Sequence, residues 1–196
     1  MAYQRKDAFY ARAKQAGYRS RAAYKLAELA RRYKLIDRGD HVVDLGAWPG
    51  GWLQVAAELV GPRGVVVGVD LKAIDQLGGV VATIVGDARD AAVREQIHSR
   101  CNGRVDVVLS DMAPSLSGVR DRDIAQAVEL ATTAVGAAVH MLAPGGNLVL
   151  KLFTAPEADA LVAEVRRRFG SAKLTRPEAT RKGSDEIYLV CLGFKA

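Results

Sequence analysis

The fold of this chain is decided by the stretch His41-Val42-Val43-Asp44-Leu45-Gly46-Ala47-Trp48-Pro49-Gly50-Gly51-Trp52. Its first five residues read as a strand, and a helical pattern follows from about Gly50 to Val60. The turn between them contains Gly46, Gly50 and Gly51. Glycines at a strand-to-helix turn let a ligand approach the backbone closely, and the helix N–H groups point into that space. A dinucleotide site would read G-x-G-x-x-G, so this spacing disfavours a dehydrogenase and suits a ligand without a pyrophosphate.

Strand-like and helical segments alternate on both sides of this turn. Further strands are expected at 65–70, 80–85, 105–110 and 147–153, and two last ones near 173–175 and 186–194. Helices are expected at 21–33, 91–100, 121–141 and 156–169, the first capped by Ser20. The pattern predicts an α/β protein with a central, mostly parallel seven-stranded sheet and helices on both faces.

The composition is that of one folded domain. The chain has 196 residues, 49% of them hydrophobic and 26% charged, with neither a linker nor an internal repeat. No apolar run approaches the roughly 18–20 residues of a membrane span, and the N-terminus lacks the apolar core of a secretory signal. Cys101 and Cys191 have no further ligand at metal-binding spacing, so they are expected to be reduced thiols. We therefore expect a single cytoplasmic domain over residues 1–196, with no metal and no membrane partner.

Positive charge is concentrated in two segments of the chain. The net charge is +6 overall. Residues 1–38 hold eleven Lys or Arg against three Asp or Glu, and residues 166–182 hold seven against one, so the rest of the chain is acidic. Solvated helix faces are the alternative interpretation, which suits Arg166–Arg168 taken alone. The pattern favours a nucleic acid, which we expect to lie across a helical 1–38 segment and the 166–182 cluster.

Two acids follow the next strands of the predicted sheet. Asp70 ends the strand at 65–70 and lies 24 residues after Gly46, where a carboxylate can accept hydrogen bonds from both hydroxyls of a ribose. Asp87 follows the third strand, where its carboxylate can meet the exocyclic amine of an adenine. Either acid could instead cap a helix. Because ligands bind at the carboxyl ends of parallel strands, the positions together predict a nucleoside site at that edge.

Four charged residues lie in surroundings that do not suit a solvated side chain. Asp111 follows an apolar strand, Lys151 interrupts the apolar run 148–153, and Glu186 starts the last strand. Lys25 lies on the N-terminal helix, where a solvated lysine is the simpler alternative. Lysines are almost never buried unless paired, so Lys151 in particular needs a partner or an aqueous cleft.

Three segments carry a resemblance to a known family. They are Arg19-Ser20-Arg21-Ala22-Ala23-Tyr24-Lys25-Leu26, Val43-Asp44-Leu45-Gly46-Ala47 with Pro49-Gly50-Gly51-Trp52, and Ser110-Asp111-Met112-Ala113-Pro114 with Ser117-Gly118. From about Asp7 to Lys195, the chain resembles the FtsJ-type (RlmE-like) ribosomal RNA large-subunit 2′-O-ribose methyltransferases. It departs from the family at Trp48, which replaces a small residue, and at Ser115 and Leu116, which replace Asn-Met.

The resemblance implies a Rossmann-like methyltransferase fold, an S-adenosylmethionine cofactor and a reaction. The family's catalytic set falls on Lys25, Asp111, Lys151 and Glu186. Its cofactor contacts fall on Gly50, Trp52, Asp70, Asp87 and Asp111, to which the glycine turn adds Gly46 and Gly51. The implied function is 2′-O-methylation of a uridine ribose in large-subunit (23S-type) ribosomal RNA by a monomer, with no DNA partner.

The expected chemistry needs the hydroxyl oxygen, the methyl carbon and the sulfur in line, with help in removing the hydroxyl proton. Lys151 is the candidate that deprotonates or orients the hydroxyl, and both roles stay open, with Lys25 as a neighbouring cation. The alternatives are a methyltransferase acting on tRNA or an mRNA cap, and a non-catalytic RNA-binding module of ribosome assembly. An oxidoreductase on a similar sheet would leave the four charged residues unexplained.

Overall fold

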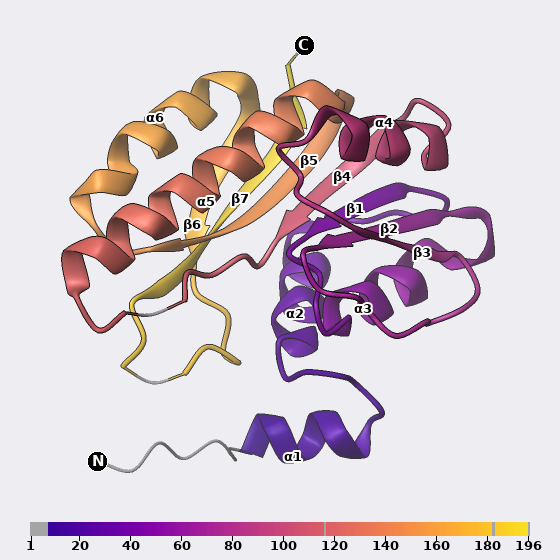
Figure 1. Ribbon diagram of the computed structural model, residues 1–196, viewed down its shortest axis with the longest axis horizontal. Coiled ribbons are helices and arrows are strands. Elements are labelled where there is room, and N and C mark those ends of the chain that lie inside the picture. Colours follow the sequence, from indigo (N-terminus) through magenta and orange to yellow (C-terminus); the bar gives the residue numbers. More distant parts are fainter. Residues whose placement is uncertain (1–7, 116, 182, 196) are drawn as a thin grey trace.

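A seven-stranded sheet forms the centre of the computed structural model, which describes residues 8–115, 117–181 and 183–195 (Figure 1). The strands are β1 (His41–Leu45), β2 (Val65–Asp70), β3 (Val81–Val85), β4 (Val105–Ser110), β5 (Leu142–Phe153), β6 (Phe169–Thr175) and β7 (Glu186–Phe194). Their order is β3-β2-β1-β4-β5-β7-β6, and β7 runs antiparallel to both of its neighbours while the other pairs are parallel. The predicted mostly parallel seven-stranded sheet is confirmed.

Helices cover both faces of the sheet, and each face has its own apolar core. On one face lie α2 (Ala23–Tyr33) and α3 (Gly51–Val60), followed by the short helix η1 (Gly61–Arg63). On the other lie α4 (Ala91–Arg100), α5 (Arg120–Met141) and α6 (Asp159–Arg168), the last preceded by η2 (Pro156–Ala158). The side chains of β5 point alternately to the two faces of the sheet. Val149 packs in the core on the side of α2 and α3, and Leu148 and Leu150 pack in the core on the side of α4, α5 and α6.

α5 is long and apolar enough for a membrane span by length and composition alone. Its small residues form a stripe against β4 and β5 that includes Ala127, Ala131, Ala134 and Ala138. Their spacing of three or four residues is that of one helix face packed on a core. One face of α5 is therefore packed against the sheet of the α/β fold.

The N-terminal segment, predicted to be helical over residues 1–38, contains two helices among its described residues and differs from the prediction at Ser20. The first helix, α1 (Ala8–Gln15), precedes α2 and contacts it through Phe9, whose ring centroid is 5.9 Å from that of Tyr24. The prediction that Ser20 caps α2 is wrong, because α2 starts at Ala23 after a turn closed by hydrogen bonds such as Ala23 N–H to Ser20 O. Ser20 instead lies against the backbone of Gly51.

Two elements in the C-terminal half of the chain also differ from the prediction: β5 is longer, and the expected helix 156–169 is two helices. Strand β5 begins at Leu142 and not at Asn147, and its register to β4 jumps from Val105↔Leu142 to Val107↔Asn147. Helix α5 ends at Met141. Residues 143–146, which include Pro144-Gly145-Gly146, thus form a bulge inside strand β5. The expected helix 156–169 splits into η2 and α6.

The carboxyl ends of β1, β2, β4 and β5 meet at one edge of the sheet. Because β7 is antiparallel to β5, its first residue, Glu186, lies opposite Phe153 at this same edge. The edge therefore collects the turn after β1, the acids after β2 and β4, the end of β5 and the start of β7.

Candidate active site

Lys25 is buried at this edge and is paired. Helix α2 packs Leu26 and Leu29 fully into the core while Lys25, 6% exposed, extends toward β7. Its Nζ lies 2.5 Å from Glu186 Oε1 and donates to Tyr188 Oη at 3.1 Å. The interpretation of Lys25 as a solvated helix lysine is therefore wrong.

Lys151 is buried beside the first pair and has its own carboxylate. Its Nζ donates to the backbone carbonyl of Asp111 at 2.6 Å and to Asp111 Oδ1 at 3.1 Å. An ammonium group has three N–H donors. Among the described residues only Asp111 accepts from Lys151, so one donor is left for a ligand.

Tyr188 joins the two ion pairs, and sequence reasoning missed it. Its hydroxyl donates to Asp111 Oδ1 at 2.6 Å, and Glu186 Oε1 lies 3.1 Å from the Tyr188 hydroxyl oxygen. Burial, followed by the charges of Asp111 and Glu186, raises the pKa of Tyr188 well above its usual value, so the hydroxyl keeps its proton. A sequence signal existed, because residues two apart on a strand share a face and Tyr188 follows Glu186 by two.

Asp111 is held in its ionised form. Burial alone would raise its pKa, but the charges of Lys151 and Lys25 and the hydrogen bond from Tyr188 outweigh burial and lower the pKa below its usual value. The structure thus brings together the four predicted residues Lys25, Asp111, Lys151 and Glu186, with Tyr188 between them. We call these five residues the charge cluster.

A pocket with a volume of about 630 Å³ opens beside the cluster. Its lining includes Gly46, Trp48, Asp70, Asp87, Asp111 and Met112. Four of the residues predicted to bind a cofactor therefore face one cavity. Gly46 has φ +75°, and a Cβ there would collide with Met112, so this position needs glycine for two reasons.

Gly50, Gly51 and Trp52 do not line this pocket. A Cβ on Gly50 would lie 3.0 Å from Nη1 of Arg19, and one on Gly51 would collide with Ser20. The buried Trp52 ring donates from Nε1 to the carbonyl of Ala22 at 2.8 Å. These three residues fasten the 19–22 segment to α3, and their predicted contact with a cofactor stays a prediction.

The two strand-end acids have different partners. Asp70 accepts from the backbone N–H of Trp48 at 3.0 Å and of Lys72 at 2.9 Å, which fixes its carboxylate at the pocket rim. Asp87 is held by the guanidinium of Arg89, which lowers the pKa of Asp87 through hydrogen bonds at 2.6 to 3.1 Å. A ligand would have to compete with an exposed arginine for Asp87.

Asp44 lies beneath this pocket without a visible hydrogen-bond donor. It is 1% exposed, and neither carboxylate oxygen has a partner among the described residues. Burial raises its pKa well above the usual value, and the charges of Asp111 and Asp70 add to this. The sequence did not single out Asp44, because an acid at the end of an apolar strand was taken only as part of the glycine turn.

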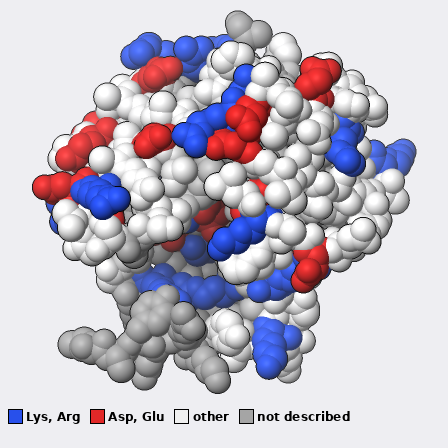
Figure 2. Space-filling view, in the orientation of Figure 1, with Lys and Arg blue, Asp and Glu red and all other residues white. Residues whose placement is uncertain are grey.

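Basic residues lie around a hollow on one face of the molecule. Figure 2 shows a row of Lys and Arg side chains below a hollow near the middle of one face, with acidic and basic groups on its floor. Arg12 lies over the ring of Tyr24, and Arg21 Nη2 donates to the carbonyl of Ala179, so α1, α2 and the 176–185 loop adjoin one another. Residues 1–7 and Lys182, which belong to the predicted basic segments, lie outside the described residues.

The prediction that the whole 166–182 cluster forms one surface with residues 1–38 is wrong. Arg168 accepts a backbone hydrogen bond from Lys195, and Phe169 pairs with Phe194 at the end of β7. Glu186, at the other end of β7, is eight residues from Phe194, which is about 26 Å at 3.3 Å per residue. Arg166–Arg168 therefore lie at the edge of the sheet opposite the charge cluster.

The family can now be assigned. The model of the FtsJ-like methyltransferases matches residues 18–194, nearly the whole described chain. The chain belongs to the FtsJ-like methyltransferase family. The methyltransferase family that the sequence motifs predicted is thus confirmed.

Relatives of this FtsJ-like methyltransferase are found in archaea. The ribosomal RNA large subunit methyltransferase E of Natronomonas pharaonis is 50% identical over 189 residues, covering 96% of this chain and 74% of the relative. The protein of the same name from Methanothermobacter thermautotrophicus is 45% identical, covering 99% of this chain and 92% of the relative. A Plasmodium falciparum protein described as a ribosomal RNA methyltransferase has a similar structure, with a TM-score of 0.80 at 27% identity, covering 90% of this chain and 98% of that one.

Replacing Tyr188 by Phe tests the bridge between the ion pairs. We expect Tyr188→Phe to lower the free energy of unfolding in urea by about 1–3 kcal/mol, because Asp111 and Lys25 each lose a buried partner. We also expect the rate of methyl transfer to fall by more than the loss of folded protein explains, because both lysines are then free to shift. Tyr33→Phe is the control, because the Tyr33 hydroxyl has no hydrogen bond among the described residues. Equal stability and activity of the two variants would contradict the bridging role.

Replacing Asp44 by Asn tests its burial. A carboxyl whose pKa is raised on folding keeps its proton where the unfolded chain has lost it, so its contribution to stability falls as pH rises from about 3.8 through the folded-state pKa. The stability of Asp44→Asn relative to the wild type should therefore increase between pH 4 and pH 8, measured by urea unfolding of the ligand-free protein. A constant difference across this range would show that Asp44 is not buried as a proton-binding group.

Proposed function

We propose that this enzyme transfers the methyl group of S-adenosylmethionine to the 2′-hydroxyl of a uridine ribose in large-subunit (23S-type) ribosomal RNA. The observation that carries the proposal is the charge cluster, in which a buried lysine with a spare donor adjoins a pocket of cofactor size. The names of the archaeal relatives support a large-subunit ribosomal RNA target. The reaction on ribose and the choice of uridine follow from the family resemblance of the four charged residues.

The volume and the polar groups of the pocket support S-adenosylmethionine as its ligand. The pocket volume of about 630 Å³ lies within the usual range for small-molecule sites. Asp70 offers carboxylate oxygens to ribose hydroxyls, and Gly46 leaves room that a side chain would fill. Asp111, at the inner end of the pocket, offers a carboxylate to the cationic amino-acid part. The bound sulfonium supplies an already activated methyl group.

The residues of the cluster prepare the acceptor. We assign Lys151 Nζ one of two roles: as an ammonium group it holds the ribose hydroxyl oxygen with its spare donor, and as a neutral amine it takes the hydroxyl proton. Asp111 fixes that ammonium group through its carboxylate and its carbonyl. Lys25 and Glu186 neutralise each other and, through Tyr188, orient Asp111. The cluster thus positions a hydroxyl without placing a net charge beside it.

The RNA surface consists of α1, α2 and the loop before β7. Arg12 and Lys14 lie on α1, Arg31 and Arg32 on α2, and Arg176 in the loop. We propose that the 1–38 segment, as part of a single domain, contacts phosphates here and that binding weakens steeply with salt. An enzyme with this target would act in the cytoplasm, where ribosomes assemble, and the proposal takes it as a monomer.

Lys151→Ala tests the reaction and the target together. We expect methyl transfer from labelled S-adenosylmethionine to unmodified large ribosomal subunits to fall at least about 100-fold, because the positioned donor is lost. Lys195→Ala, an exposed lysine at the far edge, is the control and should keep full activity. The modified ribose is located by alkali resistance of the adjacent bond.

Each other outcome of this experiment contradicts part of the proposal. Label confined to tRNA would replace the target and keep the chemistry. Label on a base, with an alkali-labile backbone, would refute the ribose reaction. Cofactor binding with no transfer to any RNA would favour the non-catalytic alternative.

Trp48, the departure from the family pattern, provides a test of the cofactor site. Its ring is 51% exposed at the pocket mouth with Lys72 Nζ 4.6 Å from the ring centroid, whereas Trp52 is buried. We expect S-adenosylhomocysteine to change tryptophan emission in the wild type and not in Trp48→Ala. The variant should bind it several-fold more weakly by calorimetry, because apolar contact area is lost. An unchanged affinity would show that Trp48 does not contact the cofactor.

A further inference from the structure

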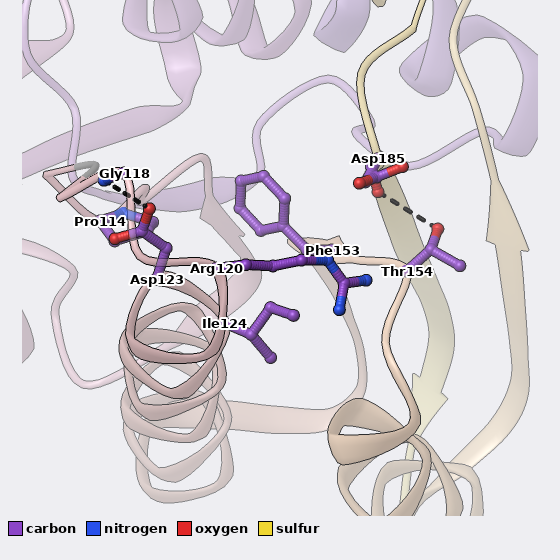
Figure 3. Close-up of a pocket in the computed structure, with 8 residues that line it drawn as sticks. All are labelled: Pro114, Gly118, Arg120, Asp123, Ile124, Phe153, Thr154 and Asp185. Carbon is purple, nitrogen blue, oxygen red and sulfur yellow. Dashed lines mark hydrogen bonds between the residues drawn. The ribbon is translucent and has the colours of Figure 1, made fainter.

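A second pocket, with a volume of about 300 Å³, opens beside the charge cluster (Figure 3). It is lined by the end of β5, the start of α5 and the residue before β7. The side chains that matter below are Pro114, Arg120, Ile124, Phe153, Thr154 and Asp185. None of them lines the cofactor pocket.

The segment 111–115 separates the two pockets. Asp111, Met112, Ala113 and Ser115 line the cofactor pocket, whereas Pro114 lines the second one. A single stretch of chain after β4 is thus the wall between them. The second pocket therefore lies across this segment from the cofactor pocket.

The ladder between β5 and β7 fixes how near this pocket is to Lys151. Lys151 pairs with Tyr188, and Phe153 pairs with Glu186. Residues two apart on a strand share a face at a spacing of about 6.6 Å. Phe153 is therefore the next member of the row that contains Lys151, and Asp185 is the neighbour of Glu186. A ribose and its attached base span a comparable distance.

The pocket combines apolar walls with two unpaired charges of opposite sign. Phe153, Ile124 and Pro114 supply the apolar surface, and Figure 3 shows the Arg120 side chain extending across the pocket toward Thr154. Among the described residues, neither the Arg120 guanidinium nor the Asp185 carboxylate has a hydrogen-bond or ion-pair partner. The backbone of Asp185 is fixed, because its carbonyl accepts from Thr154 N at 2.9 Å and Thr154 Oγ1 at 3.2 Å.

A phosphate does not suit this pocket. The N–H groups before α5 that would bind an anion already donate to Asp123, from Ser117 at 2.8 Å and from Gly118 at 3.2 Å. Asp185 adds a second negative charge to the lining. A flat, uncharged ligand with both a donor and an acceptor on its edge fits better. Single RNA bases are such ligands, and proteins bind them by stacking and by hydrogen bonds to their edges.

We propose that this pocket holds the base of the nucleotide that is methylated. Phe153 provides the stacking surface, Arg120 donates to a base oxygen, and Asp185 accepts from the adjacent ring N–H. A carbonyl oxygen next to a ring N–H occurs on the pairing edge of uracil and guanine and is absent from that of adenine and cytosine. The inference rests on the proposed function, because it takes the acceptor to be a ribose held at Lys151.

A cycle between enzyme and RNA variants tests this assignment. The wild type, Arg120→Gln and Asp185→Asn are assayed on an RNA with the intact target nucleotide and on one whose target ribose lacks its base. We expect Arg120→Gln to lower kcat/KM about 10- to 100-fold on the intact RNA and less than about 2-fold on the abasic RNA. Asp185→Asn should narrow the preference for uracil over cytosine at the target. Arg122→Gln, on the same helix outside the pocket, is the matched control.

The outcomes separate this inference from the function on which it rests. An equal loss for Arg120→Gln on both RNAs, with normal wild-type activity, would refute the base pocket and leave the methyl transfer intact. Absence of any 2′-O-methyl product from the wild type would refute the proposed function and this inference with it. Binding of S-adenosylhomocysteine should be unchanged in both pocket variants, which shows that the cofactor side is undisturbed.

Discussion

The burial of two lysine ammonium groups is the constraint on which the rest of the site depends. Lys25 and Lys151 are each less than a tenth exposed, and an unpaired charge at such a depth is strongly unfavourable. Removing one partner of a buried ion pair typically costs about 3–5 kcal/mol. Glu186 and Asp111 supply the opposite charges, and Tyr188 links them. Since these groups come from α2, the residue after β4, β5 and β7, the cluster can form only when all four elements are packed together.

The one antiparallel strand makes this meeting possible. In a sheet of parallel strands, residues useful to a site lie where strands end, because the ends meet at one edge. A seventh parallel strand would present its last residues there and take Glu186 and Tyr188 to the opposite edge. Inserted antiparallel between β5 and β6, β7 presents its first residues instead. The same reversal sends Phe194, and with it Arg166–Arg168, to the far edge.

The sheet and the four charged residues could be predicted because both leave local signals. Strand periodicity needs no tertiary information, and a lysine inside an apolar run such as 148–153 contradicts its surroundings enough to be noticed. Tyr188 carries no such contradiction, since tyrosine is common in strands. Arg166–Arg168 are close in sequence to the other basic residues of the 166–182 cluster. Strands β6 and β7 nevertheless place these three arginines at the edge of the sheet opposite the site. Gly50 and Trp52 are assigned by resemblance and Gly51 by the glycine turn, and their packing on residues 19–22 depends on tertiary contacts that no local pattern contains.

The segment 111–115 links the cofactor side of the enzyme to its acceptor side. Asp111 lines the cofactor pocket and also holds Lys151, so a shift of this segment would move both at once. Its position is set from below by Gly46, where any side chain would collide with Met112. Gly46 is therefore required by the packing of the protein on itself. The glycine turn that decides the fold thus also fixes, through Met112, the position of the segment that carries Asp111.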